Sequence, residues 1–433
     1  MAEAPSSDTT IDEVAAFASM CKNASSLIVC GRETLVMDLR FSEEEEQFRA
    51  EVREFLEKEL PSGWKKKRTG MGGEEAMAAS MGFIGKLVQK GWLVGSWPQE
   101  YGGRGWTFTQ QLIFNEEMSY RGAVRGDFLG HAIAGPAIIT YGTEEQKKKH
   151  LPPIAKSEKF WCQLFSEPDA GSDLPALKTR AVDSGDEYIV NGQKVWTSAA
   201  GTASWGVLLA RTNPDVPKRE GITYFLLDMK SPGVSINALP AMGLGRHHIH
   251  ETFLDNVHIP KDCVLGGLEW VNRGWEQARK TLEFERSGIA GFASSQRMLE
   301  EMVEYAKENE RGGRPLAEDP LVRQRLAAMQ TEIEVGRMLS YRVNWMQSQG
   351  IEYAYEPAQA KLYSSELSQR LTQLGMWLLG LYGQLEKRSK WSISGGRFER
   401  AYLVTPSNTV GGGTTEIMRN NIARRMGLPV APE

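Results

Sequence analysis

Residues 161–173 read WCQLFSEPDAGSD, and this stretch separates two kinds of sequence pattern. It begins with a short run of strand-forming residues and ends in a loop rich in Pro, Gly, Ser and Asp. Before it, apolar residues recur at helical spacing, and after it short β-forming runs alternate with turn residues as far as residue 271. The stretch therefore marks the passage from a helical segment to a β segment.

The preceding segment, residues 38–160, is predicted to be an N-terminal helical domain. Ser42 stands before four Glu residues at 43–46, which suits an N-cap followed by acidic residues at the positive end of a helix dipole. Further helical patterns cover residues 74–90, 110–121 and 143–156. Residues 1–37 lack such patterns, so we expect a disordered extension there.

Residues 161–271 are predicted to form a middle domain, a small antiparallel β-barrel or sandwich. Seven short β-forming runs are separated by turn residues. Asn191 and Gly192 stand between two of these runs, a pair typical of a tight β-hairpin. We therefore expect a hairpin turn at this pair.

The helical pattern returns in residues 272–433, which are predicted to form a C-terminal four-helix bundle. Amphipathic stretches cover residues 279–307, 320–347, 357–385 and 416–426. Helices of this length bury their apolar faces against one another. The whole chain is thus predicted to be an α+β protein of several domains, in the order α, β, α.

Composition excludes several classes of protein. The 433 residues carry a formal net charge of −4, which argues against a nucleic-acid surface. No apolar run approaches the roughly 18 residues that a membrane span requires. The 4 cysteines have neither metal-ligand spacing nor a disulfide pattern, which favours a cytoplasmic location.

The loop at residues 166–173 is the first candidate site. Such a loop can present backbone N–H groups and a hydroxyl to a planar hydrogen-bonding ring or to a phosphate. It can equally be a plain connecting turn. Loop chemistry alone leaves both interpretations open.

The same stretch resembles the Thr/Ser-Glu-Pro-x-x-Gly-Ser-Asp signature of the acyl-CoA dehydrogenase family. Four further segments resemble family segments, in the family's order and spacing across residues 38–430. They are YGTEEQ at 141–146, KVWTS at 194–198, TFLDNVHIP at 252–260 and GGGTTEI at 411–417. Five ordered matches make the resemblance specific.

The resemblance implies a bound FAD. Ser166 would hydrogen-bond the edge of the flavin ring, Ser172 would meet the pantetheine or pyrophosphate of CoA, and Trp196 would cover the ring. An isolated Trp is more often a core residue, so Trp196 has that second interpretation. The cofactor-binding residues that the resemblance implies are Gln163, Leu164, Phe165, Ser166, Gly171, Ser172, Trp196, Thr197, Ser198, Gly413, Thr414 and Glu416.

The resemblance also implies a carboxylate base, because a thioester α-hydrogen is only weakly acidic. In most of the family this is a Glu just before the Gly-Thr of the C-terminal loop, where this chain has Gly412. The isovaleryl-CoA and long-chain branches instead use a Glu immediately before an Arg. Glu285 and Arg286 match that pair, so Glu285 is the predicted base and Arg286 a predicted contact of CoA.

Glu283 competes with Glu285 for this role. On a continuous helix two residues subtend about 200°, so only one of the two carboxylates faces a given cavity. Glu285 would share its face with Leu282, Gly288 and Ile289, which are apolar or small. Such neighbours desolvate a carboxylate, and they favour Glu285 as the base.

The function implied is that of an FAD-dependent acyl-CoA dehydrogenase of lipid metabolism and β-oxidation. Glu285 would remove the α-proton, the β-hydride would pass to flavin N5, and a trans-2-enoyl-CoA would form. An electron-transfer flavoprotein would take the electrons. Two alternatives stay open: a flavin oxidase or monooxygenase of the same fold, and a non-catalytic partner chain.

Two departures from the family pattern bear on assembly. The positions whose side chains clasp the neighbouring subunit's FAD in the family hold Asn309, Gly312, Gly313 and Trp377. Asn cannot replace the charge-assisted contact of an Arg. The chain is therefore expected in a homotetramer or, like the dehydrogenases of steroid side-chain degradation, in a heterotetramer with a related chain.

The compact run His247, His248 and His250 suggests a metal site at first sight. No carboxylate or cysteine is placed convincingly beside it, and the family needs no metal there. We expect no bound metal.

Overall fold

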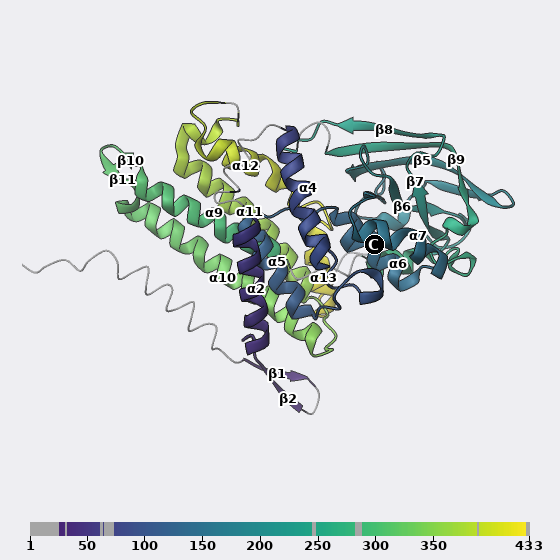
Figure 1. Cartoon of the computed structure of the whole chain (residues 1–433), viewed down its shortest axis with the longest axis horizontal. Coiled ribbons are helices and arrows are strands. Elements are labelled where there is room, and N and C mark those ends of the chain that lie inside the picture. The colour runs from purple at the N-terminus through teal and green to yellow at the C-terminus, as the bar shows by residue number, and fades with distance from the viewer. Residues whose placement is uncertain are drawn as a thin grey trace, which may run out of the picture.

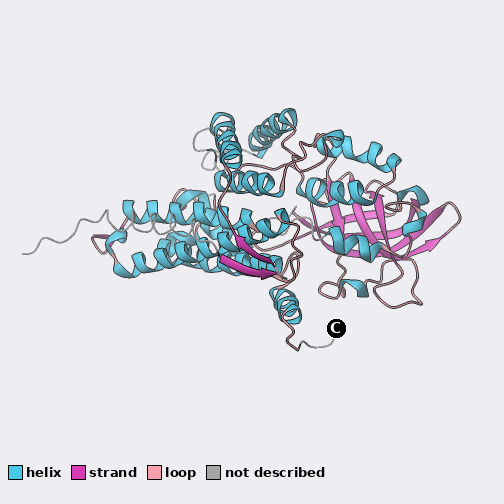
Figure 2. Cartoon of the chain, turned by 90° about the horizontal axis from the view of Figure 1, so that it is seen from below, coloured by secondary structure: helices cyan, strands magenta, loops and turns pink. Residues whose placement is uncertain are grey.

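The chain folds into a helical N-terminal domain, a middle domain with a curled sheet and a helical C-terminal domain (Figures 1 and 2). The computed structural model describes residues 26–30, 33–60, 64, 73–244, 248–281, 288–387 and 389–429. The sheet lies at one end of the molecule and the long bundle helices at the other. The α+β fold class predicted from the sequence is confirmed.

The N-terminal helices begin where the sequence places capping residues. Ser42, Thr107 and Thr143 each form a capping box, in which side chain and backbone of the N-cap and N3 residues exchange hydrogen bonds. The π-helical turn η2 (Gly130–Ala134) continues directly into α6. The helices are α2 (Glu43–Glu59), α4 (Gly73–Lys90), α5 (Phe108–Arg121), α6 (Gly135–Tyr141) and α7 (Glu144–Ala155).

The middle domain is one sheet in the order β3-β6-β4-β5-β9-β8, with β7 paired to β6. All pairings are antiparallel except β3–β6 and the single β4–β6 pairing, which are parallel. The strands are β3 (Trp161–Leu164), β4 (Arg180–Asp183), β5 (Glu187–Ser198), β6 (Trp205–Arg211), β7 (Ile222–Asp228), β8 (Val234–Leu239) and β9 (Ile249–Pro260).

Strands β6 and β7 are buried on both faces. Val207 and Leu209 belong to a core shared with α6, α7 and α8, whereas Leu208 and Ala210 belong to a core within the curled sheet. Side chains alternate between the two faces because successive residues of a strand point in opposite directions. One face of the sheet is therefore fixed against the helices.

The predicted hairpin at Asn191 and Gly192 is wrong, because both residues lie inside the continuous strand β5. The pairing of β5 with β9 shifts its register between Val190 and Gly192, so the glycine marks an irregularity in the strand. A Cβ on Gly192 would lie 2.4 Å from Thr179 Oγ1. The glycine thus permits the close approach of Thr179, which directly precedes β4, and close backbone approach is a second common use of Gly in a sheet.

The C-terminal domain is built around α9, α10, α11 and α12, which share one apolar core. Its helices are α8 (Gly274–Thr281), α9 (Ile289–Glu308), α10 (Pro320–Ser348), α11 (Glu356–Leu379), α12 (Arg397–Asn408) and α13 (Thr415–Arg425). The two-residue strands β10 (Glu310–Arg311) and β11 (Arg314–Pro315) pair between α9 and α10.

The expected continuous helix over residues 279–307 is wrong. Helix α8 ends at Thr281, and α9 starts after Gly288, whose φ of 70° is left-handed. A left-handed residue interrupts an α-helix, so positions before and after Gly288 do not share one helical face. Ile289 therefore does not share a helical face with residue 285, whereas Leu282, Glu283 and Glu285 lie outside the described residues, so the choice of Glu285 over Glu283 stays a prediction.

Shorter elements connect the helices and strands. Strands β1 (Ser26–Cys30) and β2 (Glu33–Met37) pair antiparallel within the segment that we expected to be a disordered extension. No described helix or strand crosses residues 37, 160 or 271, where we placed the domain limits, which stay predictions. The single-turn helices are η1 (Gln99–Tyr101), η3 (Leu174–Ala176), η4 (Lys261–Cys263), η5 (Leu268–Trp270), η6 (Leu316–Glu318), η7 (Gly380–Gln384) and η8 (Ile393–Gly396).

A buried ionic cluster joins the N-terminal helices to the bundle. Glu116 of α5 accepts hydrogen bonds from Arg49 of α2 at 2.9 Å and, on its other oxygen, from Arg337 and Tyr341 of α10, both at 2.9 Å. Burial opposes ionisation of Glu116, but the guanidinium groups of Arg337 and Arg49 hold its pKa below the ordinary value. The carboxylate thus ties three helices from two domains together.

Within the described part of the chain, every helix is too short or too polar to span a bilayer. Cys162 and Cys263 are buried free thiols.

Replacing Glu116 with Leu should lower the free energy of unfolding by about 3–5 kcal/mol, because Arg49, Arg337 and Tyr341 would lose the buried carboxylate that they share. The measurement is urea unfolding followed by circular dichroism. Glu54→Leu on the exposed face of α2 is the matched control and should change stability by less than about 0.5 kcal/mol. Equal losses in the two variants would contradict a linking role for Glu116.

Candidate functional site

The loop after β3 is a tight structure of its own. Glu167 and Ala170 exchange two backbone hydrogen bonds, at 3.0 and 3.1 Å, around Pro168 and Asp169. Beyond this turn Gly171 and Ser172 are exposed. A Cβ added to Gly171 would meet no atom within 4 Å, so the space beside it is open to a ligand.

A fully buried ion pair fixes this loop to the strand β5. Lys194 Nζ donates to Glu167 Oε1 at 2.7 Å and to the Phe165 carbonyl at 3.0 Å. The same carboxylate accepts from the backbone N–H groups of Lys178 at 2.6 Å and Thr179 at 2.9 Å. A single pair of side chains thus holds three backbone segments in register.

Burial lowers the pKa of Lys194 to about 8, although the attraction of Glu167 opposes this effect. Glu167 is also buried, but the charge of Lys194 and its hydrogen bonds keep the pKa of its carboxyl below the ordinary value. Both groups are therefore ionised at pH 7. A charged pair in a dry interior is costly to break by removing one partner.

We call the ion pair of Lys194 and Glu167 the clamp. Trp196 projects from β5 beside it. The pairing of β5 with β9 shifts register between Lys194 and Thr197, and Trp196 takes a φ of 60° at this bulge. The indole is 65% exposed, an unusual state for so large an apolar side chain. Left-handed backbone at a bulky residue is strained and concentrates at functional sites. The interpretation of Trp196 as a core residue is therefore wrong.

The bulge also turns Thr197 inward. Thr197 is buried, and its backbone carbonyl lies 3.3 Å from His250 Nδ1. Its hydroxyl oxygen and Gln163 Nε2 are both buried polar atoms without a hydrogen-bond partner. Buried groups of this kind normally have partners, which a bound ligand or an ordered water would supply at these two atoms.

These features fit a planar ring with hydrogen-bonding edges, such as a flavin. Trp196 offers a flat apolar face, while Gln163 and Thr197 offer unpartnered polar atoms. Leu164 and Phe165 lie in the two cores of the sheet, so only their backbone can meet a ligand. We call the segments 163–172 and 194–198 together the cradle; they are held together by the clamp and by a 2.9 Å hydrogen bond from Val195 N–H to the Ser166 carbonyl.

The other predicted cofactor residues lie in the bundle. Lys361 of α11 donates to the carbonyl oxygens of Asn408 and Gly413 and so braces the Gly-rich loop 409–414. Thr414 caps α13 by accepting from Ile417 N–H at 3.2 Å. Among the described residues, no hydrogen bond joins Gly413, Thr414 or Glu416 to the cradle.

Glu285, Glu283 and Arg286 fall outside the described residues, and so does His247. Within the described ranges, no three His, Cys, Asp or Glu side chains gather closely enough to hold a metal ion. His250 is buried under the bulge of β5, which gives it a structural contact.

Asn309 and Trp377, two of the departures from the family pattern, are half-buried in the C-terminal domain. The Asn309 side chain donates to the Tyr305 carbonyl at 2.9 Å. Two guanidinium groups approach the Trp377 ring, Arg325 at 4.1 Å and Arg311 at 5.6 Å from its centroid. Arg311 also donates to the Leu378 carbonyl at 2.9 Å. Both positions thus make contacts within their own chain.

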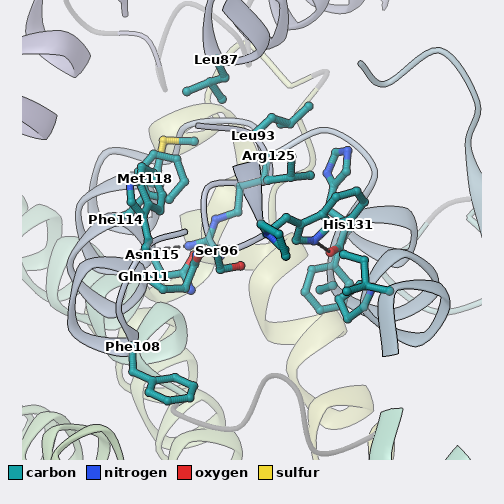
Figure 3. A pocket seen from close by; sticks show the side chains of 18 of the residues that line it. Leu87, Leu93, Ser96, Phe108, Gln111, Phe114, Asn115, Met118, Arg125 and His131 are labelled. Carbon is teal, nitrogen blue, oxygen red and sulfur yellow. Dashed lines mark hydrogen bonds between the residues drawn. The ribbon is translucent and has the colours of Figure 1, made fainter. Parts of the chain in front are cut away.

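A cavity of about 450 Å³ lies in the helical N-terminal domain (Figure 3). Its wall comes from the end of α4, the segments 93–98 and 106–107, α5, η2 and α6. None of the predicted site residues lines it. The sequence carried no signal for this cavity, because its lining comes from segments with unrelated periodicities.

Lys194 and Glu167 received no role in the sequence analysis, although both lie in segments that we quoted. A usable signal existed for Lys194. Lys194 is separated from the buried residues Tyr188 and Val190 of β5 by an even number of positions, so its side chain is expected on the same face of the strand. A Lys at a buried strand position requires a partner. The partner itself could not be found from the sequence, because Glu167 lies 27 residues earlier.

Comparison with known proteins gives a consistent picture. Three family models match the chain: "Acyl-CoA dehydrogenase, N-terminal domain" over residues 42–158, "middle domain" over 162–257 and "C-terminal domain" over 272–427. Acyl-CoA dehydrogenase IpdE1 of Mycobacterium tuberculosis is 33% identical over 89% of this chain and 98% of its own. Acyl-CoA dehydrogenase FadE34 of the same organism is 36% identical over 79% of this chain, which spans about half (45%) of that longer protein.

Solved structures of known proteins also resemble this chain along nearly its whole length. The ChsE4–ChsE5 complex of Mycobacterium tuberculosis contains a chain of 31% identity with a TM-score of 0.80, covering 91% of this chain and 100% of that one. The "Tcur3481-Tcur3483 steroid ACAD" gives 30% identity with a TM-score of 0.80, at 91% and 100% coverage.

Replacing Glu167 with Gln should loosen the cradle, because a neutral amide cannot accept from Lys178, Thr179 and Lys194 together. Amide hydrogen exchange at residues 178 and 179 should become at least tenfold faster, and the free energy of unfolding should fall by about 3–5 kcal/mol. The matched control is Asp169→Asn, since that carboxylate pairs with Lys178 at an exposed site. Unchanged exchange at residues 178 and 179 in Glu167→Gln would refute the clamp.

Proposed function

The chain belongs to the acyl-CoA dehydrogenase family, and we propose that it is an FAD-dependent acyl-CoA dehydrogenase with Glu285 as its base. One observation carries the cofactor part of this proposal. The strained, exposed Trp196 immediately precedes Thr197, whose hydroxyl lacks a hydrogen-bond partner, as does Gln163 Nε2. A flavin would cover the indole and supply hydrogen-bond partners.

The residues of the cradle would orient the cofactor. Trp196 would cover one face of the ring, and Ser166, Thr197 and Ser198 would donate to its polar edge. Ser172 would meet the CoA portion of the substrate. When bound, FAD supplies the acceptor for the β-hydride, and the protein supplies alignment and electrostatics.

Glu285 would remove the α-proton of the acyl thioester and hold it on its carboxyl group. The base must be a carboxylate close to the substrate, and Gly412 leaves none at the usual position. Gly288, at the start of α9, lies against Ala360, next to the Lys361 that braces the Gly-rich loop. Gly288 therefore lies against α11 next to the lysine that braces the loop without a base, which supports the proposal.

Replacing Glu285 with Gln should leave FAD binding intact but reduce acyl-CoA turnover by at least about 10³-fold, because the variant loses its proton acceptor. The measurement is anaerobic bleaching of the flavin absorbance by a panel of acyl-CoA thioesters. Glu283→Gln is the matched control and should keep at least half of the wild-type rate.

Loss of acyl-CoA turnover in Glu283→Gln alone would assign the role of base to Glu283. Fast oxygen consumption without an added electron acceptor would indicate an oxidase in place of a dehydrogenase.

We further propose that the chain works beside a related chain and passes electrons to an electron-transfer flavoprotein. Asn309 and Trp377 make contacts within their own chain where the family pattern has residues that reach a neighbouring flavin. Two similar structures carry paired names, ChsE4–ChsE5 and Tcur3481–Tcur3483. Caffeyl-CoA reductase subunit CarC of Acetobacterium woodii, 29% identical, is named as part of an Etf complex. Acyl groups with rings, as in the steroid relative, belong in the substrate panel.

Purified alone, the chain should hold less than one FAD per subunit, and co-expression with a related dehydrogenase chain should raise flavin content and turnover at least tenfold. The physical reason is that Asn309 cannot supply the charge of an Arg to a neighbouring pyrophosphate. Flavin absorbance per subunit and analytical ultracentrifugation measure the result. Asn309→Arg should raise the FAD content of the isolated chain. Full FAD occupancy and high turnover of the wild-type chain alone would contradict the proposal.

A further inference from the structure

Two left-handed residues bracket the end of β5. Trp196 and Ala199 have φ values of 60° and 59°, and Thr197 and Ser198 lie between them. Left-handed backbone costs a non-glycine residue free energy, so it persists only where neighbouring groups hold it. Strand β9 pairs with this end of β5 (Figure 1). The contacts made from β9 therefore decide how residues 197 and 198 are presented to a ligand.

His250 of β9 makes the side-chain contact with this segment. Its Nδ1 lies 3.3 Å from the Thr197 carbonyl oxygen, and the residue is only 4% exposed. Because a carbonyl oxygen only accepts hydrogen bonds, Nδ1 carries the hydrogen and donates it. On the other side of the ring, a Cβ added to Gly201 would lie 2.8 Å from Nε2, so the loop after β5 encloses the imidazole. The donor is thus held in place.

The orientation of the Thr197 carbonyl fixes that of the next N–H group. In a planar trans peptide the carbonyl and the following N–H point in opposite directions, and the described part of the chain contains no cis peptide bond. The Thr197 carbonyl points toward His250, so the Ser198 N–H points away from it. Earlier on the same strand, Val195 N–H donates to the Ser166 carbonyl at 2.9 Å. This part of β5 therefore lies beside the loop that is open to a ligand.

We propose that His250 is a positioning residue for the flavin. Its hydrogen bond to the Thr197 carbonyl fixes the peptide between residues 197 and 198, so that the Ser198 N–H is a preset donor to the polar edge of the ring that Trp196 covers. A donor fixed in advance needs no rearrangement when charge develops on its acceptor. This inference rests on the cofactor part of the proposed function and is independent of Glu285 and of the acyl group.

The measurable consequence is the midpoint potential of the bound flavin. Reduction increases the negative charge on the ring, and hydrogen bonds to a charged acceptor are stronger than those to a neutral one. A fixed donor at the polar edge therefore stabilises the reduced form more than the oxidised form, and loss of the donor lowers the potential. A tenfold loss of this preference corresponds to about 30 mV for a two-electron couple.

Three substitutions of His250 test the proposal in the flavin-loaded protein by spectroelectrochemical titration. An Asn places its amide N–H group near the position of Nδ1, a Gln places it near that of Nε2, and a Leu has no donor. We expect His250→Gln and His250→Leu to lower the midpoint potential by at least about 30 mV, a tenfold change. His250→Asn should change the equilibrium by less than twofold, about 9 mV. The matched control is His258→Leu at an exposed position of β9, which should leave the potential unchanged.

If His250→Leu does not fold, the comparison of His250→Asn with His250→Gln decides the question. Retention of flavin by His250→Asn and its loss from His250→Gln would support the proposal in the same way as a lowered potential. Equal effects of the two variants, on the potential or on flavin retention, would show that the ring only fills space and would overturn the proposal.

The same protein separates this inference from the dehydrogenase activity. If the wild type holds FAD but no acyl-CoA bleaches it, the dehydrogenase function is refuted, and the potentials of the variants still test His250. A wild-type chain that takes up no FAD, alone or with a related chain, would refute the cofactor part of the proposed function and with it this role of His250.

Discussion

The buried carboxylate of Glu116 is the interaction on which the arrangement of the helical domains depends. It lies at the contact of α5 with α2 and α10 and pairs with a guanidinium from each, Arg49 and Arg337. A buried charge requires its partners in a narrow geometry, since removing one partner leaves the others unsolvated. Apolar packing of the same helices tolerates small displacements, whereas this cluster does not. The cluster therefore fixes α5, which contributes to the wall of the helical-domain cavity, against α2 and α10.

The cradle uses the same physical device on a smaller scale. Lys194 and Glu167 are buried beneath the loop that has to remain open to a ligand. The loop leaves the sheet after Leu164, and a backbone hydrogen bond from Val195 N–H of β5 still reaches its Ser166 carbonyl. The clamp adds charge-assisted bonds to three backbone groups, Phe165 C=O, Lys178 N–H and Thr179 N–H. This rigid base offsets the strain of about 1–3 kcal/mol that a left-handed Trp196 represents.

Much of the fold could be predicted from the sequence, because helix periodicity and capping residues are local signals. The capping boxes at Ser42 and Thr143 start helices where the pattern placed them. The failures arose where a local signal has two physical meanings. Asn191 and Gly192 can form a turn or permit close strand contact, and only the approach of Thr179 decides between them. Likewise, the helical period around residue 285 did not reveal the left-handed break at Gly288.

The candidate site was predictable only in part for a related reason. Its segments are local motifs, but Lys194–Glu167 and Lys361–Gly413 join residues far apart in the chain. The Gly-rich loop shows what such long-range contacts impose. Gly412 and Gly413 have φ values of 69° and 97°, a backbone that a side chain adopts only with strain. With Lys361 holding this conformation, a glutamate at position 412 would be strained by about 1–3 kcal/mol. The loop geometry and the absence of a base at Gly412 are therefore consistent with each other, and the carboxylate has to come from another segment, for which Glu285 is the proposed source.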